Sequence, residues 1–121
     1  MTLEEISRYC LSLPLVTEDV KWDNVLCYSV AGKLFFVVSL DEVPCGASFK
    51  VPDDVFEELS ENPNFIQAPY FAKNKWIKIL DIGNLKISDK EEFILQAYNL
   101  IKQKLTKKLQ KDIDDLFTTM V

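Results

Sequence analysis

Apolar residues near the N-terminus recur at the spacing of an α-helix. The run Thr2-Leu3-Glu4-Glu5 has the form of a capping box, and Pro14 cannot continue a helix. These features predict a helix from about residue 2 to residue 13 that packs on a core through one apolar stripe. That stripe consists of Leu3, Ile6, Cys10 and Leu13.

From residue 18 to residue 51 the pattern changes to that of β-strands. Residues 25–30 and 33–40 are dense in Val, Leu, Phe and Tyr, and Ala31-Gly32 lies between them as a hairpin turn. Alanine is a poor residue at positive φ, so we expect a loop wider than two residues. A third strand over 46–51 follows the acidic loop 41–45, and the three strands form an antiparallel meander.

The pattern returns to helices after residue 51, with one more strand between them. Pro52 suits the first turn of a helix, the Asn62-Pro63 pair ends it, and residues 75–80 read as a strand. A turn is expected at Gly83-Asn84. The run Ser88-Asp89-Lys90-Glu91 has the form of a second capping box and predicts a long helix to about residue 105.

Residues 106–121 are predicted to form a short C-terminal helical tail, amphipathic from 109 to 117. The complete order is helix, three strands, helix, one or two strands and long helix. This order predicts an α+β fold of two layers, in which helices pack on one face of an antiparallel sheet. The other face of the sheet then looks outward, and we call it the open face.

Alternation along the strands predicts which side chains reach the open face. In the strand 33–40, Leu34, Phe36, Val38 and Leu40 are expected to face the helices. Lys33, Phe35, Val37 and Ser39 are then expected on the open face. The same rule applied to 46–51 directs Lys50 to the open face, so Lys33 and Lys50 are predicted to project from the same side of the sheet.

The strand 75–80 can be read in either phase, and we favour Ile77 and Ile79 in the core. Basic side chains interleaved with aromatic rings resemble a surface that contacts phosphates and stacks on bases. In an alternative interpretation, Phe35, Trp76 and Trp22 close a second small core under the loop 62–74. The candidate ligand or nucleic-acid face consists of Lys33, Phe35, Lys50, Lys75, Trp76 and Lys78.

Composition restricts the chemistry of this chain. The chain has 121 residues and no histidine, which excludes catalysis by a histidine side chain. Its formal net charge is −5, so we do not expect it to attract nucleic acid indiscriminately. Cys10, Cys27 and Cys45 are not closely paired, which suits a reducing compartment. The lysines between residues 102 and 111 are expected to form a solvated face. Their positive charge is favourable near the C-terminus of the long helix, where the helix dipole is negative. No catalytic residues, metal site or cofactor site are predicted, and no segment is apolar enough to span a bilayer.

Several short motifs in order resemble the YjbR/MmcQ family over roughly residues 3–110. The resemblance implies a single YjbR/MmcQ-like domain over 1–121, a fold similar to CyaY-like and double-wing domains, and a cytoplasmic bacterial protein. It implies DNA binding by fold analogy. The motifs are Leu13-Pro14, Glu18-Asp19-Val20-Lys21-Trp22, Gly32-Lys33-Leu34-Phe35, Ser48-Phe49-Lys50-Val51, Ala68-Pro69-Tyr70, Lys75-Trp76, Tyr98-Asn99-Leu100 and Lys104-Leu105.

Two hypotheses follow for a non-enzymatic binding domain. In the first, the open face binds DNA through its lysines and aromatic rings. In the second, the chain binds a protein partner or a second copy of itself. The contact buries Phe35 and Val37 of the open face or Phe117 of the tail.

Overall fold

The computed structural model describes residues 2–22, 24–68 and 75–120 of the chain. Its strands form one antiparallel sheet in the order β1-β2-β3-β4-β6-β5. The elements are α1 (Leu3–Ser12), β1 (Val16–Lys21), β2 (Val25–Val30), β3 (Lys33–Ser39), β4 (Gly46–Lys50), α2 (Asp53–Ser60), β5 (Phe65–Gln67), β6 (Trp76–Ile79), the short 3-10 helix η2 (Ile82–Asn84), α3 (Ile87–Lys102) and α4 (Lys107–Met120).

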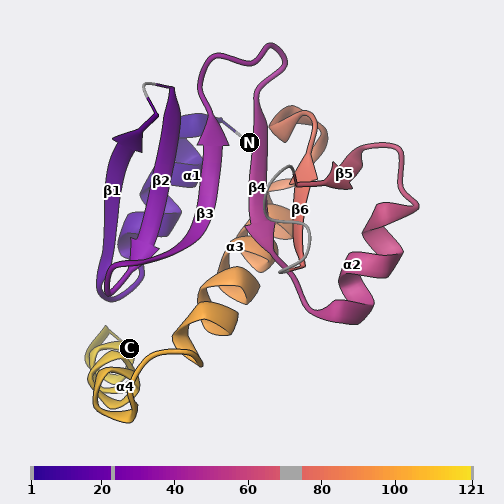
Figure 1. The fold of residues 1–121 in the computed structure, drawn as a ribbon. Helices are drawn as coiled ribbons and strands as arrows, with labels where there is room; N and C mark the ends of the chain where they lie inside the picture. Colours follow the sequence, from indigo (N-terminus) through magenta and orange to yellow (C-terminus); the bar gives the residue numbers. More distant parts are fainter. Residues whose placement is uncertain (1, 23, 69–74, 121) are drawn as a thin grey trace.

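Helices cover one face of this sheet, as the sequence predicts (Figure 1). Helix α3 packs across β2, β3 and β4, while α1 packs beside it on β1. Helix α2 lies against β5 and β6 at the far edge. The predicted α+β architecture, an antiparallel sheet with helices on one side, is therefore confirmed.

The edge strand β1 was not predicted, and the edge strand β5 was predicted only as an optional second strand without bounds; their composition explains why. In β1 nearly every residue is exposed, so the segment Val16–Lys21 shows no apolar alternation to mark it. Strand β5 has only three residues, of which Phe65 alone is buried. Charged and short edge strands protect a sheet against pairing with other chains, and the same properties hide them in a sequence.

The two predicted capping boxes have different outcomes. In α1, Thr2 Oγ1 accepts a hydrogen bond from the Glu5 backbone N–H at 3.2 Å, and the Glu5 carboxylate accepts one from the Thr2 backbone N–H at 2.9 Å. The second box is wrong. Helix α3 begins at Ile87 with Lys86 in the N-cap position and no side-chain cap, because Ser88 already lies inside the first turn.

The β2–β3 turn is tighter than expected. Val30 pairs directly with Lys33, so the loop contains only Ala31 and Gly32, at φ 48° and 84°. Positive φ at both central residues is the geometry whose twist matches a two-residue hairpin. The expectation of a wider loop was wrong because the pairing of the strands imposes this turn despite the strain at the alanine.

We expect Ala31→Asn to stabilise the protein by about 0.5–1 kcal/mol, because asparagine tolerates positive φ and Asn-Gly is the preferred pair for this turn. The reverse test is Gly32→Ala. No atom lies within 4 Å of the Cβ that this change adds, so it introduces backbone strain without a clash and should destabilise by about 1 kcal/mol. Urea denaturation of the two variants measures both effects, and an equal change of the same sign in both would contradict the assignment.

A β-bulge in β3 changes the face that each side chain occupies. Tyr28 pairs with Phe36 and Ser29 pairs with Leu34, so Phe35 is the extra residue. Both Phe35 and Phe36 consequently join the helix-side core, and Leu34 moves to the open face, where it packs on Val37 and its neighbours.

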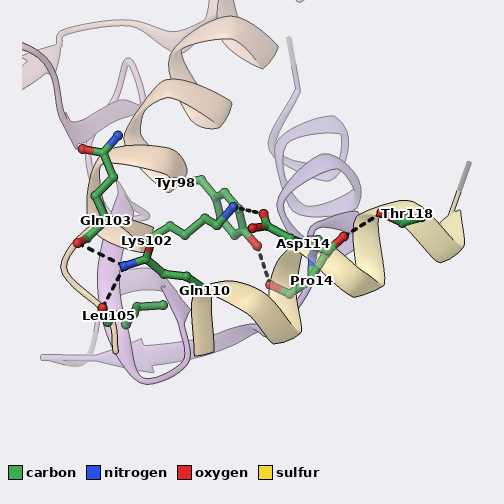
Figure 2. A network of polar contacts seen from close by, with 8 residues as sticks. All are labelled: Pro14, Tyr98, Lys102, Gln103, Leu105, Gln110, Asp114 and Thr118. Atoms are coloured by element: carbon green, nitrogen blue, oxygen red, sulfur yellow. Dashed lines mark hydrogen bonds and ion pairs between the residues drawn. The ribbon is translucent and has the colours of Figure 1, made fainter. Parts of the chain in front are cut away.

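Helix α4 docks on the end of α3 rather than extending from it. Ile113 is fully buried, and the Phe117 ring meets the Tyr98 ring edge-on at 6.1 Å. Figure 2 shows the polar contacts around this junction. Gln110 Nε2 donates to the carbonyl oxygens of Leu105 and Gln103 at 2.9 and 3.4 Å.

Two further contacts hold the same region together. Lys102 forms an ion pair with Asp114 of α4. The Tyr98 hydroxyl donates at 2.7 Å to the carbonyl oxygen of Pro14, which links α3 to the turn after α1 (Figure 2). The ends of α1, α3 and α4 thus form one packed unit.

Candidate nucleic-acid interface

The open face carries a small buried cluster rather than exposed aromatic rings. Trp76 lies on this face, as predicted, but only 5% of it is exposed. It packs with Cys27, Val37 and Ala68, and Val25 and Leu34 close the cluster at its edge. The alternative interpretation, a second small core, is confirmed for Trp76. Part of its expected cover, residues 69–74, lies outside the described residues.

The other two aromatic residues assigned to that second core lie elsewhere. Phe35 is fully buried on the helix side, where its ring meets Tyr98 edge-on at 5.6 Å. Its predicted place on the open face is wrong, because the bulge reverses the alternation at this point. Trp22 is 67% exposed in the β1–β2 turn.

The predicted shared side for Lys33 and Lys50 is also wrong. Lys33 pairs with Val30, a residue of the helix-side core, so the register places Lys33 on that side. Lys50 pairs with Trp76 and is placed on the open face, as predicted. Leu40, expected to face the helices, lies just beyond the end of β3 and is 39% exposed.

The remaining predicted lysines are already engaged with the protein. Lys75 Nζ lies 5.0 Å from the centre of the Phe56 ring, a cation–π distance. Lys78 Nζ lies 2.6 Å from Glu42 Oε2 and is mostly buried in this ion pair. The predicted stacking platform is therefore not assembled, because its aromatic rings are buried and its Lys78 charge is balanced.

Lysines do gather at one end of the molecule, which we call the basic end. The β2–β3 turn, the end of β4, the start of β6 and the connection from α3 to α4 all lie there (Figure 1). Burial lowers the pKa of Lys50, and the nearby Lys104 charge lowers it further, while Asp53 opposes the shift. The basic end consists of Lys33, Lys50, Lys75, Lys104, Lys107 and Lys108.

Three of these lysines are absent from the candidate face predicted from the sequence. Lys104, Lys107 and Lys108 were interpreted there as a solvated face at the end of the long helix and in the tail, where lysines complement the C-terminal dipole. In the structure α3 ends at Lys102 and a new helix begins at Lys107, so Lys107 and Lys108 occupy a helix N-terminus. Cations are unfavourable there, and the first turn of α4 contains no acidic residue to offset them.

The opposite end of the sheet is acidic. It contains the β3–β4 loop with Asp41 and Glu42, and it also contains Asp81 before η2. The lysines of the basic end are thus separated from these three carboxylates, while Asp53 lies close to Lys50. Local attraction for a polyanion is possible at one end despite an acidic total.

Metal binding and nucleophilic chemistry each place requirements on metal-ligand groups and thiols. Residues 2–22, 24–68 and 75–120 contain no group of three or more Asp, Glu, Cys or His side chains placed to hold a metal ion. The three thiols are free, and burial raises the pKa of Cys10, Cys27 and Cys45. A raised pKa lowers the thiolate fraction, so none of them is an activated nucleophile.

A family model described as YjbR matches residues 11–100, about three quarters of the chain. The chain belongs to the YjbR family. The match includes all six strands and most of α3, whereas Lys104, Lys107 and Lys108 lie beyond it. The YjbR region therefore carries the fold, and half of the basic end lies outside the matched residues.

Two solved structures share the fold of this YjbR chain. A Deinococcus radiodurans protein with a DUF419 domain has a TM-score of 0.83 at 21% identity, over 93% of this chain and 88% of that one. A Pseudomonas syringae protein has a TM-score of 0.69 at 15% identity, over 83% of this chain and 98% of that one. No curated protein matches the sequence. None of the described helices is both long and apolar enough to cross a bilayer.

Proposed function

We propose that this chain is a non-enzymatic, cytoplasmic bacterial domain that binds the phosphate backbone of duplex DNA through its basic end. The observation that carries the proposal is the position of Lys107 and Lys108 at the N-terminus of α4. The helix dipole disfavours them there, and a bound anion would offset that repulsion. The three free cysteines suit a reducing compartment.

The arrangement favours backbone contacts over base recognition. Lys33, Lys104, Lys107 and Lys108 are exposed side chains from separate segments, and lysine recognises phosphate as a point charge. Among the described aromatic residues, Trp22 is the one left mostly exposed, and it lies at the opposite end of the sheet. We therefore expect binding without sequence selectivity and without stacking on single-stranded bases.

Protein interaction through the open face has less support than the sequence suggested. That hypothesis relied on Phe35 and Val37 as exposed apolar residues, and both are buried. Phe117, assigned to the same role in the tail, packs against Tyr98. The residues chosen for a partner are thus largely used within the fold.

The test is fluorescence anisotropy of a labelled 20-base-pair duplex titrated with protein at several salt concentrations. We expect the slope of log affinity against log salt to be about −3 to −4, since each phosphate contact contributes roughly −0.9. The double variant Lys107→Glu/Lys108→Glu should weaken binding by at least about 10-fold. It should also make the slope less steep by about 2, because two phosphate contacts are lost. A second duplex of unrelated sequence should bind with the same affinity within about 3-fold.

A matched control separates a local site from total charge. Lys21→Glu/Lys86→Glu changes the charge by the same amount at exposed positions of the acidic end. We expect this control to change the affinity by less than about 3-fold, because screening limits charge effects across the molecule. Equal losses in the two double variants, or no binding of the unaltered protein at low salt, would show the proposal to be wrong.

A further inference from the structure

Strand β1 is a long free edge of the sheet (Figure 1). It comes first in the strand order and pairs only with β2 among the described strands. Every residue of β1 after Val16 is exposed. An edge strand of this length carries a row of backbone donors and acceptors that a further strand can bond.

The hydrogen bonds between β1 and β2 decide which backbone groups point outward. The Ala31 N–H donates to the Leu15 carbonyl oxygen at 3.0 Å, which continues the register of the two strands. Hydrogen-bonded pairs alternate with non-hydrogen-bonded pairs in an antiparallel ladder, so the odd-numbered residues of β1 bond to β2. The N–H and C=O groups of Glu18 and Val20 therefore point away from the sheet.

The side chains of β1 present opposite charges on one face. The partners of Asp19 and Lys21 in β2 both belong to the small cluster on the open face, so these two side chains project from that face. Neither forms an ion pair within the described part of the chain. Val20 pairs with a residue of the helix-side core and projects from the other face.

The charges select one register when β1 meets β1 of a second copy. Because the even-numbered residues must bond across the edge, the two-fold axis between the copies passes at a single residue of β1. An axis at Glu18, Asp19 or Lys21 places two identical charges opposite each other, which is destabilising. An axis at Thr17 pairs no charges. An axis at Val20 places Asp19 of each copy opposite Lys21 of the other, in the non-hydrogen-bonded pairs where side chains lie closest.

Exposed apolar side chains also gather at this edge. Val20 is 52% exposed, and Trp22, which directly follows the strand, is 67% exposed. The Ser7 hydroxyl of α1 donates to Glu18 Oε2 at 2.6 Å, so this side of α1 faces β1. Leu11 lies one turn later on the same side of α1 and is 47% exposed. A strand added to β1 would cover apolar surface together with the open backbone groups.

We propose that two copies of this chain associate through their β1 strands, antiparallel, about a two-fold axis at Val20. Two backbone hydrogen bonds join the two Val20 residues, and Asp19 of each copy pairs with Lys21 of the other. The sheets of the two copies become continuous, with their helices on the same side. The contact is short, so we expect a weak dimer with Kd of about 10–100 µM. This proposal does not depend on DNA binding.

Sedimentation equilibrium of the full chain between about 5 µM and 1 mM measures this Kd. Asp19→Lys and Lys21→Asp should each weaken the dimer by at least about 10-fold, because each change creates two pairs of like charges. Asp19→Lys/Lys21→Asp should restore the Kd to within about 3-fold, since opposite charges then face each other again. An equimolar mixture of the two single variants should form a heterodimer more readily than either variant forms a homodimer.

Two further variants separate the backbone contact from total charge. Val20→Pro removes an N–H that points outward, a position where an edge strand tolerates proline, and should weaken the dimer by at least about 10-fold. Circular dichroism checks that this variant is folded. Lys86→Asp makes the same charge change as Lys21→Asp at an exposed position outside β1 and should leave the Kd within about 2-fold. DNA titrations with Lys21 variants belong below the dimer Kd, where the monomer predominates.

Three results would overturn the proposal. One is a monomer at about 1 mM, a concentration well above the expected Kd. Another is a dimer that the single charge changes weaken but the double change does not restore, because the strands would then meet in a different register. The third is a dimer that Lys86→Asp weakens as much as Lys21→Asp, which would place the contact away from β1.

Discussion

Replacing Trp76 with alanine is expected to lower the free energy of unfolding by about 3–5 kcal/mol. The ring is 5% exposed and packs with Cys27, Val37 and Ala68 on the open face of the sheet. The substitution removes the largest side chain of this cluster and leaves a cavity on the open face beside Cys27, Val37 and Ala68, because the surrounding sheet cannot collapse to fill it. Urea denaturation followed by circular dichroism measures the change.

Trp22 provides the matched control, since it is the only other tryptophan of the chain. It is 67% exposed in the β1–β2 turn, so Trp22→Ala should change the free energy of unfolding by less than about 1 kcal/mol. If the two tryptophan variants lost equal stability, the assignment of one ring to a core and the other to the surface would be wrong. An affinity change for duplex DNA in Trp76→Ala, without a stability loss, would restore the predicted stacking role.

Replacing Ile113 with alanine is expected to lower the free energy of unfolding by about 2–5 kcal/mol. Ile113 is the fully buried residue of α4, and Phe117 one turn later packs edge-on against Tyr98. Loss of this side chain would loosen α4 and with it the contacts of Gln110 and Asp114. The variant should show one cooperative transition at lower denaturant concentration.

The control for this prediction is Leu116→Ala on the same helix. Leu116 is 41% exposed whereas Ile113 is fully buried, so truncating Leu116 should change the stability by only about 1 kcal/mol. A separate low-stability transition in the Ile113 variant, with the main transition unchanged, would mean that α4 unfolds independently of the sheet. That result would contradict the packing of α4 on the helix-side core.

The layers of the fold could be predicted because apolar periodicity records burial directly. Helices α1 and α2 and strands β2, β3, β4 and β6 all bury one face and show the matching pattern. The strand β1 could not be predicted, because an exposed edge strand such as Val16–Lys21 has no buried face to record. The break between α3 and α4 was predicted about three residues too late, because the apolar residues Ile101, Leu105 and Leu109 keep a helical spacing across it.

The candidate site was harder to predict than the fold, and two local features explain this. Alternation assigns faces only where pairing is regular, and one extra residue in β3 exchanged the positions of Leu34 and Phe35. Pairing between side chains is not visible in sequence either: Lys78 read as a free surface charge, whereas Glu42, 36 positions earlier, binds it. Lys50 and Lys78 both kept their predicted place on the open face, and Lys50 is the one of the two that lies at the basic end.

The β-bulge also sets a rule for comparing this chain with distant relatives. Residues before Phe35 and residues after it follow opposite phases of alternation, so the two parts of β3 cannot be aligned by one hydrophobic pattern. In a relative that lacks the extra residue, the side chains between the hairpin turn and the bulge would lie on the opposite faces of the sheet from those they occupy here. A single-residue gap at this position of an alignment would therefore mark the loss of the bulge. A lysine beside the turn would then move from the helix side to the open face although the residue itself is unchanged.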